Sequence, residues 1–119
     1  MKVQKVIKIP TYGCNVTIIV TDNIAVEINK IYQKYKIAAV FEDDAEGAFV
    51  TINLDDYYLV FENDYLSHNT IAHEIFHATV RVTEDRTITD EEAQAWLAGS
   101  LTGDIYKFLE KKNLPIKHG

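Results

Sequence analysis

The spacing of apolar residues changes along the chain, and this change limits the possible folds more than any other feature. Residues 3–9 (VQKVIKI) alternate apolar and polar side chains, and residues 15–20 (NVTIIV) are rich in β-branched side chains, so both segments predict β-strands. Residues 24–35 follow a different pattern, with apolar side chains at every third or fourth position. That spacing predicts an amphipathic helix after the two strands.

The second half of the chain repeats the change from strands to helices. Residues 48–53 (AFVTIN) and 57–62 (YYLVFE) are separated by a short polar turn and predict a hairpin. Two helices follow, at about 67–83 and 89–112, joined by a short polar link. We therefore expect an α+β fold in the order ββα-ββ-αα, with a small mixed sheet of about four strands and three helices.

Length and composition restrict the class of protein. The chain has 119 residues, which suits one domain spanning residues 1–119. Cys14 is its only cysteine, so an intramolecular disulfide and a cysteine-based zinc site are excluded. The net charge of −6 argues against nucleic acid as a partner. Neither a signal peptide nor a membrane span is evident, so we expect a cytoplasmic protein that does not bind membranes. The oligomeric state stays open.

The segment NTIAHEIFHATV (69–80) carries two histidines four positions apart. On a helix, His73 and His77 lie one turn apart on the same face, as two ligands of a tetrahedral zinc ion require. Glu74 lies about 100° further round the helix, where a general base can reach a water beside the metal. The apolar residues of this helix form a separate core face without the histidines. The pattern therefore favours a metal site over two incidental polar residues.

A catalytic zinc ion usually has three protein ligands, so a third is needed. The pattern H-E-x-x-H-x-x-G-x-x-H is excluded, because Val80 and Thr83 occupy the Gly and His positions. His68 belongs to the helix start, and His118 belongs to a tail that we expect to be mobile. The remaining candidates are acidic residues at the start of the last helix.

Glu92 is the favoured third ligand. It shares a helix face with Trp96, Gly99 and Gly103, and the two glycines predict a close approach between the last two helices. Glu91 points elsewhere but stays an alternative. A second hypothesis is that Thr89 and Glu92 form a capping box at the helix start, which would not need a metal.

The residues HEIFH (73–77) followed by EEAQAWLAGSL (91–101) resemble the gluzincin metallopeptidases. Over about residues 57–105 the chain also resembles small zincin-like proteins of phages and mobile elements and, distantly, the ImmA/IrrE-type metallopeptidases. The resemblance implies a minimal zincin-like domain with an active-site helix followed by a ligand-bearing helix. It implies a zinc ion bound by His73, His77 and Glu92, with Glu74 as general base.

The chain also departs from that family. Gln94 stands where ImmA/IrrE-type proteins usually have Asn, and we expect no equivalent of the second subdomain of larger zincins in these residues. No residue is assigned as a transition-state donor: Tyr106 lies too far along the helix from Glu92, and we expect Tyr57, Tyr58 and Tyr65 to pack in the core or at its rim.

The expected function is zinc-dependent hydrolysis of peptide bonds. We expect a protein or peptide substrate to pair with an edge strand near Tyr57–Glu62. The first alternative is a zinc-binding regulatory or interaction protein with little turnover, and the second is a domain without metal. A calcium site in the acidic segment 42–46 is disfavoured, because its spacing does not match an EF-hand loop.

Overall fold

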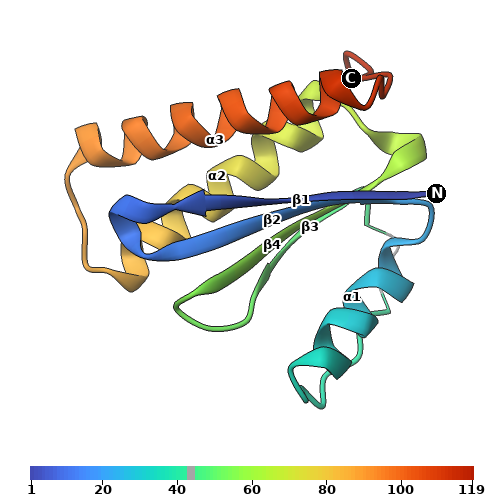
Figure 1. Ribbon diagram of the computed structural model, residues 1–119, viewed down its shortest axis with the longest axis horizontal. Coiled ribbons are helices and arrows are strands. Elements are labelled where there is room, and N and C mark those ends of the chain that lie inside the picture. Colours follow the sequence, from blue (N-terminus) through green and yellow to red (C-terminus); the bar gives the residue numbers. More distant parts are fainter. Residues whose placement is uncertain (43–44) are drawn as a thin grey trace.

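The computed structural model describes residues 1–42 and 45–119 and confirms the α+β prediction. Four strands form one mixed sheet and three helices pack on it (Figure 1). Asp43 and Asp44, which belong to the acidic segment weighed as a calcium site, lie outside the described residues. The elements in chain order are β1 Lys2–Ile9, β2 Cys14–Thr21, α1 Ile24–Lys34, β3 Gly47–Thr51, β4 Asp56–Glu62, α2 His68–Asp85 and α3 Glu91–Lys111.

The order of strands in the sheet is β1-β2-β4-β3. The β1–β2 and β3–β4 pairs are antiparallel hairpins, whereas β2 and β4 run parallel at the centre of the sheet. The expected edge strand at Tyr57–Glu62 is therefore wrong. That segment is β4, whose two sides already pair with β2 and β3, so it has no free edge. The free edges belong to β1 and β3.

Helices cover the two faces of the sheet unequally. Helices α2 and α3 lie on one face, and α1 lies on the other (Figure 1). The larger core joins Val16 and Ile18 of β2 to Ile71 of α2 and Leu101 of α3. The smaller core packs Ile28 and its neighbours on α1 against β4 and β3. Strand β4 is thus buried on both faces, which explains its nearly continuous apolar sequence.

The two free edges differ in charge. Strand β1 carries Lys2, Lys5 and Lys8, and lysines on an edge strand discourage pairing with another chain. Strand β3 has the sequence GAFVT and carries no charged side chain. Helix α2 packs beside β3 and β4. The uncharged edge of the sheet is therefore the one nearest the helix that carries the two histidines.

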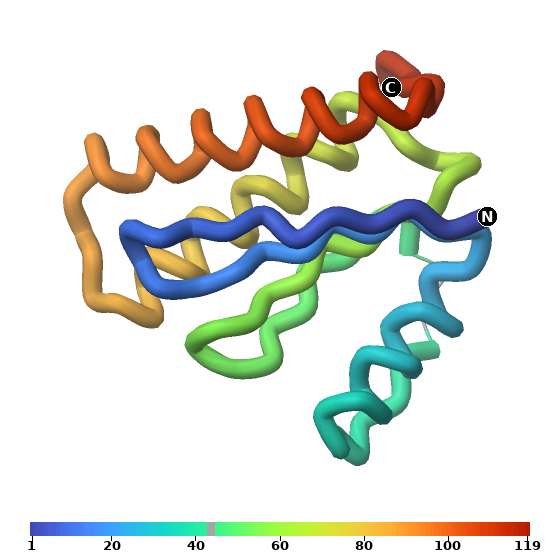
Figure 2. Tube along the Cα trace, viewed as in Figure 1, coloured from blue at the N-terminus to red at the C-terminus, as the bar shows by residue number. Residues whose placement is uncertain are grey.

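The end of the chain is held against the start of α2, contrary to the expected mobile tail (Figure 2). Lys117 forms a parallel β-bridge with Ser67, in which its amide donates to the Leu66 carbonyl at 2.9 Å. The amide of His68 donates to the Lys117 carbonyl, also at 2.9 Å. Apolar contacts of Leu114 and Ile116 with the larger core explain why the tail stays bound.

Among the described residues, no helix is both long enough and apolar enough to cross a bilayer.

Candidate metal centre

Helix α2 positions the two histidines. Its N-terminus is capped by Ser67, whose hydroxyl accepts a hydrogen bond from the Thr70 amide at 3.1 Å. The side that faces the sheet is apolar and buried, with Ile71, Ile75, Ala78 and Val82. His73 and His77 lie outside this core side, as the helical spacing predicts, and both are exposed. The fold of the helix therefore does not require the histidines.

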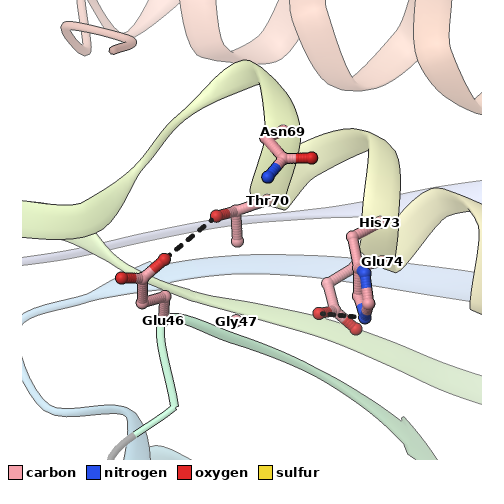
Figure 3. A pocket seen from close by; sticks show the side chains of 6 residues that line it. All are labelled: Glu46, Gly47, Asn69, Thr70, His73 and Glu74. Atoms are coloured by element: carbon pink, nitrogen blue, oxygen red, sulfur yellow. Dashed lines mark hydrogen bonds and ion pairs between the residues drawn. The ribbon is translucent and has the colours of Figure 1, made fainter. Parts of the chain in front are cut away.

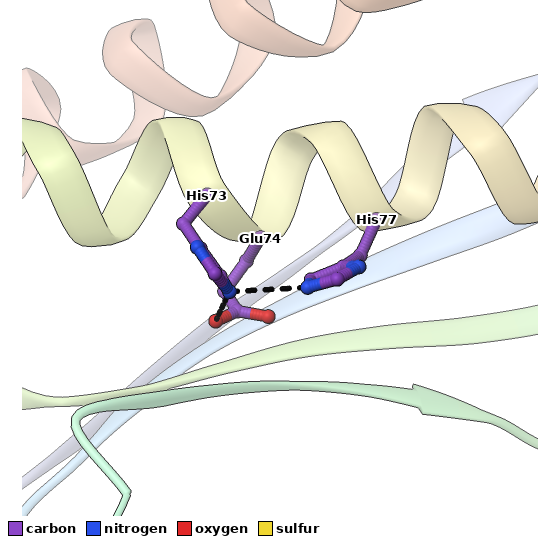
Figure 4. Close-up of side chains that lie close together, drawn as sticks. All are labelled: His73, Glu74 and His77. Atoms are coloured by element: carbon purple, nitrogen blue, oxygen red, sulfur yellow. Dashed lines mark hydrogen bonds and ion pairs between the residues drawn. The ribbon is translucent and has the colours of Figure 1, made fainter.

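The two imidazoles converge on one point (Figure 4). Nε2 of His73 lies 3.0 Å from Nε2 of His77. Two nitrogens bound to one tetrahedral zinc ion at about 2.0–2.1 Å are about 3.3 Å apart, so a small rotation of either ring gives the required separation. An oxygen of Glu74 lies 4.0 Å from Nε2 of His73. The potential ligand atoms of His73, Glu74 and His77 all lie within 4.8 Å of one another, close enough to share a metal ion.

Glu74 differs from the histidines in its burial. Its side chain is only 8% exposed, whereas the side chain of His73 is 63% exposed. Burial raises the pKa of the Glu74 carboxyl, and the nearby charges of His73 and His77 lower it to a smaller extent. A carboxylate with a raised pKa is a better proton acceptor near neutral pH than an exposed one. Its environment therefore suits a general base.

Strand β3 approaches α2 very closely at Gly47. A Cβ atom at this position would lie 2.8 Å from Cγ2 of Thr70 and 3.2 Å from Cγ of Glu74. Only a residue without a side chain allows this contact, so Gly47 sets the distance between the edge strand and the Glu74 side chain. The sequence pattern gave no indication of this role, because it depends on a contact between segments far apart in the chain.

A pocket of about 280 Å³ lies beside His73 and Glu74 (Figure 3). Residues of the β3 segment and of α2 line it: Glu46, Gly47, Asn69, Thr70, His73 and Glu74. From the sequence, Glu46 was considered only as a calcium ligand, and its place in the same pocket as His73 was not predicted. The start of β3 becomes part of the site only because the sheet places it opposite α2.

The structure does not bring Glu92 to the histidines. Among the residues that the structure describes, the cluster of potential metal ligands contains only His73, Glu74 and His77. The three side chains leave α2 on the side away from α3 (Figure 4), whereas Glu92 lies exposed in the first turn of α3. Glu91 is exposed there too. In this arrangement neither carboxylate completes the site.

The start of α3 also differs from the expected capping box. The cap is Asp90 rather than Thr89, and its side chain accepts a hydrogen bond from the Glu92 amide at 3.2 Å. The expected close approach of helices at Gly99 and Gly103 is wrong. A Cβ atom at either glycine would meet no atom within 4 Å, because this face of α3 points away from the core.

Three of the tyrosines considered as transition-state donors form hydrogen bonds with residues outside the histidine cluster of α2. Tyr57 is buried, and its hydroxyl donates to Asp85 at 2.6 Å. Burial and this hydrogen bond raise the pKa of Tyr57 to about 12. The hydroxyl of Tyr58 pairs with that of Tyr35 at 2.7 Å. Tyr57 and Tyr58 therefore pack in the core, as the sequence predicts. Tyr106 instead pairs with Nδ1 of His68, at 2.7 Å.

Comparison with protein-family models, with curated proteins and with solved structures finds no match to this chain.

Proposed function

We propose that this chain is a zinc-dependent peptidase of the gluzincin type, in which His73 and His77 hold the metal and Glu74 is the general base. One observation supports this proposal above all others: the Nε2 atoms of two exposed histidines converge beside a buried carboxylate. Zinc held by the two imidazoles would activate water as a nucleophile and polarise the scissile carbonyl.

Glu74 would carry out the proton transfers. Its carboxylate accepts a proton from the attacking water as the C–O bond forms. The protonated carboxyl then donates that proton to the amine nitrogen as the C–N bond breaks. Both proton transfers therefore use the carboxylate of Glu74. Two features support this role: burial raises the pKa of Glu74, and the close contact with Gly47 limits the positions that its side chain can adopt.

The identity of a third protein ligand stays a prediction. Glu92 follows from the resemblance to gluzincins, and it can bind the metal only if the start of α3 lies closer to the histidines in the zinc-bound protein. Glu92→Gln is then expected to weaken zinc binding, whereas Glu91→Gln is not. Equal zinc affinity of the wild type and Glu92→Gln would exclude Glu92 as a ligand.

We propose that a peptide substrate pairs with β3 rather than with the segment Tyr57–Glu62. Strand β3 has a free edge, lacks charged side chains and packs beside α2. A peptide added to this edge would gain backbone hydrogen bonds and would lie near the histidine pair. Gly47 at the start of β3 touches Glu74, which links the proposed peptide site to the proposed base.

The first experiment measures zinc in protein purified without a histidine tag. We expect about one zinc ion per chain in the wild type and a large loss in His73→Gln and His77→Gln. His118→Gln is the matched control, because His118 lies outside the cluster. A metal-free wild type after exposure to excess zinc would refute the metal site.

The second experiment tests catalysis with a complex peptide mixture. Cleavage products are identified by mass spectrometry for the wild type, for Glu74→Gln and for the control Glu84→Gln, which changes an exposed glutamate of the same helix. We expect cleavage by the wild type and the control, and a loss of at least about a hundredfold in Glu74→Gln. Equal cleavage by all three proteins would refute the role of Glu74.

The alternative is a zinc-binding protein with little turnover. The observation that favours it is the composition of the cluster: among the described residues, no side chain from outside helix α2 joins His73, Glu74 and His77. This alternative predicts zinc binding that depends on His73 and His77, together with no cleavage by either the wild type or Glu74→Gln.

A further inference from the structure

The pocket beside the histidine pair contains one carboxylate that the proposed reaction does not use. Glu46 precedes β3 and lies at the opposite side of the pocket from His73 (Figure 3). Its carboxylate accepts one long hydrogen bond, 3.4 Å from the Thr70 hydroxyl. No lysine, arginine or histidine in the described part of the chain forms an ion pair with Glu46. This acidic group is therefore available to a ligand.

The other polar groups of the pocket can also accept hydrogen bonds. The Asn69 side chain offers a carbonyl oxygen, and the Thr70 hydroxyl has a lone pair beyond its contacts with Ser67 and Glu46. Among the described residues, no lysine or arginine lines the pocket. An ammonium group has three N–H donors and no acceptor, so it matches this set of groups better than a carboxylate or an apolar side chain does.

The size of the pocket limits what it can hold. A volume of about 280 Å³ is just below the range of about 300–1,000 Å³ for small-molecule sites, so the pocket suits one side chain or chain end rather than a cofactor. Its lining includes His73 and Glu74, so a group bound there would belong to a residue close to the scissile bond. The pocket is therefore placed to select a residue of the substrate.

We propose that this pocket binds a cationic group of the substrate, with Glu46 as the residue that determines specificity. The inference rests on the proposed peptidase function and names the chemistry that its substrate carries next to the cleaved bond. The cation has two sources in a peptide, a lysine or arginine side chain and a free amino terminus. Both present the same positively charged N–H donors to Glu46, Asn69 and Thr70.

The experiment uses short peptides that differ in one charge. Hexapeptides blocked at both ends carry lysine, norleucine or glutamate at one position, and that position is varied along the peptide. A norleucine peptide with a free amino terminus tests the second source of the cation. All peptides are mixed with zinc-loaded protein, and their relative cleavage rates are measured by competition. Dissociation constants for the same peptides are measured by NMR titration, so that cleavage is not needed for the answer.

Four proteins are compared: the wild type, Glu46→Gln, Glu46→Lys and the control Glu42→Gln. Glu42 is an exposed acid of the same loop that does not line the pocket, so its substitution changes the net charge equally. We expect the wild type and Glu42→Gln to prefer a cationic peptide over its norleucine counterpart by about two- to fivefold, the range for an ion pair with an exposed carboxylate. Glu46→Gln should remove this preference. Glu46→Lys should reverse it in favour of the glutamate peptide.

Equal binding of the lysine, norleucine and amino-terminal peptides by the wild type, including no binding at all, would overturn the inference. A preference that survives in Glu46→Gln would overturn it as well. Loss of zinc in Glu46→Gln would also overturn it, since Glu46 would then act as a metal ligand. If the wild type binds zinc and prefers cationic peptides but cleaves none of them, the pocket assignment stands and the proposed peptidase activity fails.

Discussion

Replacing Gly47 by alanine tests the contact on which the candidate site depends. The added Cβ atom would lie 2.8 Å from Cγ2 of Thr70 and 3.2 Å from both Cγ of Glu74 and Cδ1 of Phe61. Thr70 cannot easily give way, because it is buried and its hydroxyl bonds to Ser67 and Glu46. Strand β3 and helix α2 must therefore move apart slightly in the variant.

The size of the effect follows from two opposing contributions. Overpacking of a well-packed contact costs about 1–3 kcal/mol. Alanine is favoured over glycine in a strand by about 0.5–1 kcal/mol, which offsets part of this cost. We expect a net destabilisation of about 1–2 kcal/mol. For a domain of this size that change lowers Tm by about 4–10 °C.

The measurement is thermal unfolding followed by circular dichroism in metal-free buffer, with Gly99→Ala as the matched control. Gly99 lies in the exposed face of α3, and a Cβ atom there meets no atom within 4 Å. The control should therefore become more stable, by about 0.8–1 kcal/mol, from helix propensity alone. A Tm of Gly47→Ala that equals or exceeds that of the wild type would refute the close approach of β3 to α2.

Three further predictions concern the same fold. Burial raises the pKa of Glu74 in the folded protein, so the contribution of the Glu74 carboxyl to stability is present at low pH and is lost as pH rises through the folded pKa. Glu74→Gln does not titrate, so the Tm of the metal-free variant minus that of the metal-free wild type should grow from pH 4.5 to 7. A difference in Tm that stays constant over this range would contradict the prediction. Tyr57→Phe removes the hydrogen bond to Asp85 and should cost about 1–3 kcal/mol in chemical denaturation, whereas no loss would contradict a role for this bond. The amide of Lys117 should exchange slowly with deuterium, and exchange at the rate of an unstructured tail would contradict its bridge with Ser67.

Local patterns were enough to predict the strands and helices, and to predict that His73 and His77 lie on one face of a helix. Alternation with period two and apolar spacing with period 3.6 are properties of neighbouring residues, so the order of strands and helices could be inferred before any tertiary contact was known. The same holds for His73 and His77, since residues four apart on a helix lie one turn apart in any fold. Their exposure followed as well, because the apolar residues of α2 form a core face without them.

Other expectations failed because they required distances between separate elements. The helical wheel of α3 placed Glu92, Gly99 and Gly103 on one face, and the structure shows that this face points away from the core. Sequence periodicity identifies a face but does not state what the face touches. The tail was expected to be mobile for a similar reason, since the partner of Lys117 lies fifty residues earlier in the chain.

The sequence alone was sufficient to predict which segments form strands and helices, the order of these elements, and that α2 displays His73 and His77 together. The tertiary structure decided which strand has a free edge: β3 lies at the edge of the sheet, whereas Tyr57–Glu62 pairs on both sides. It also placed Glu46 and Gly47 beside His73 and Glu74. The physical reason is that strand order and helix packing depend on long-range burial and backbone pairing, which combine segments whose local patterns carry no information about one another.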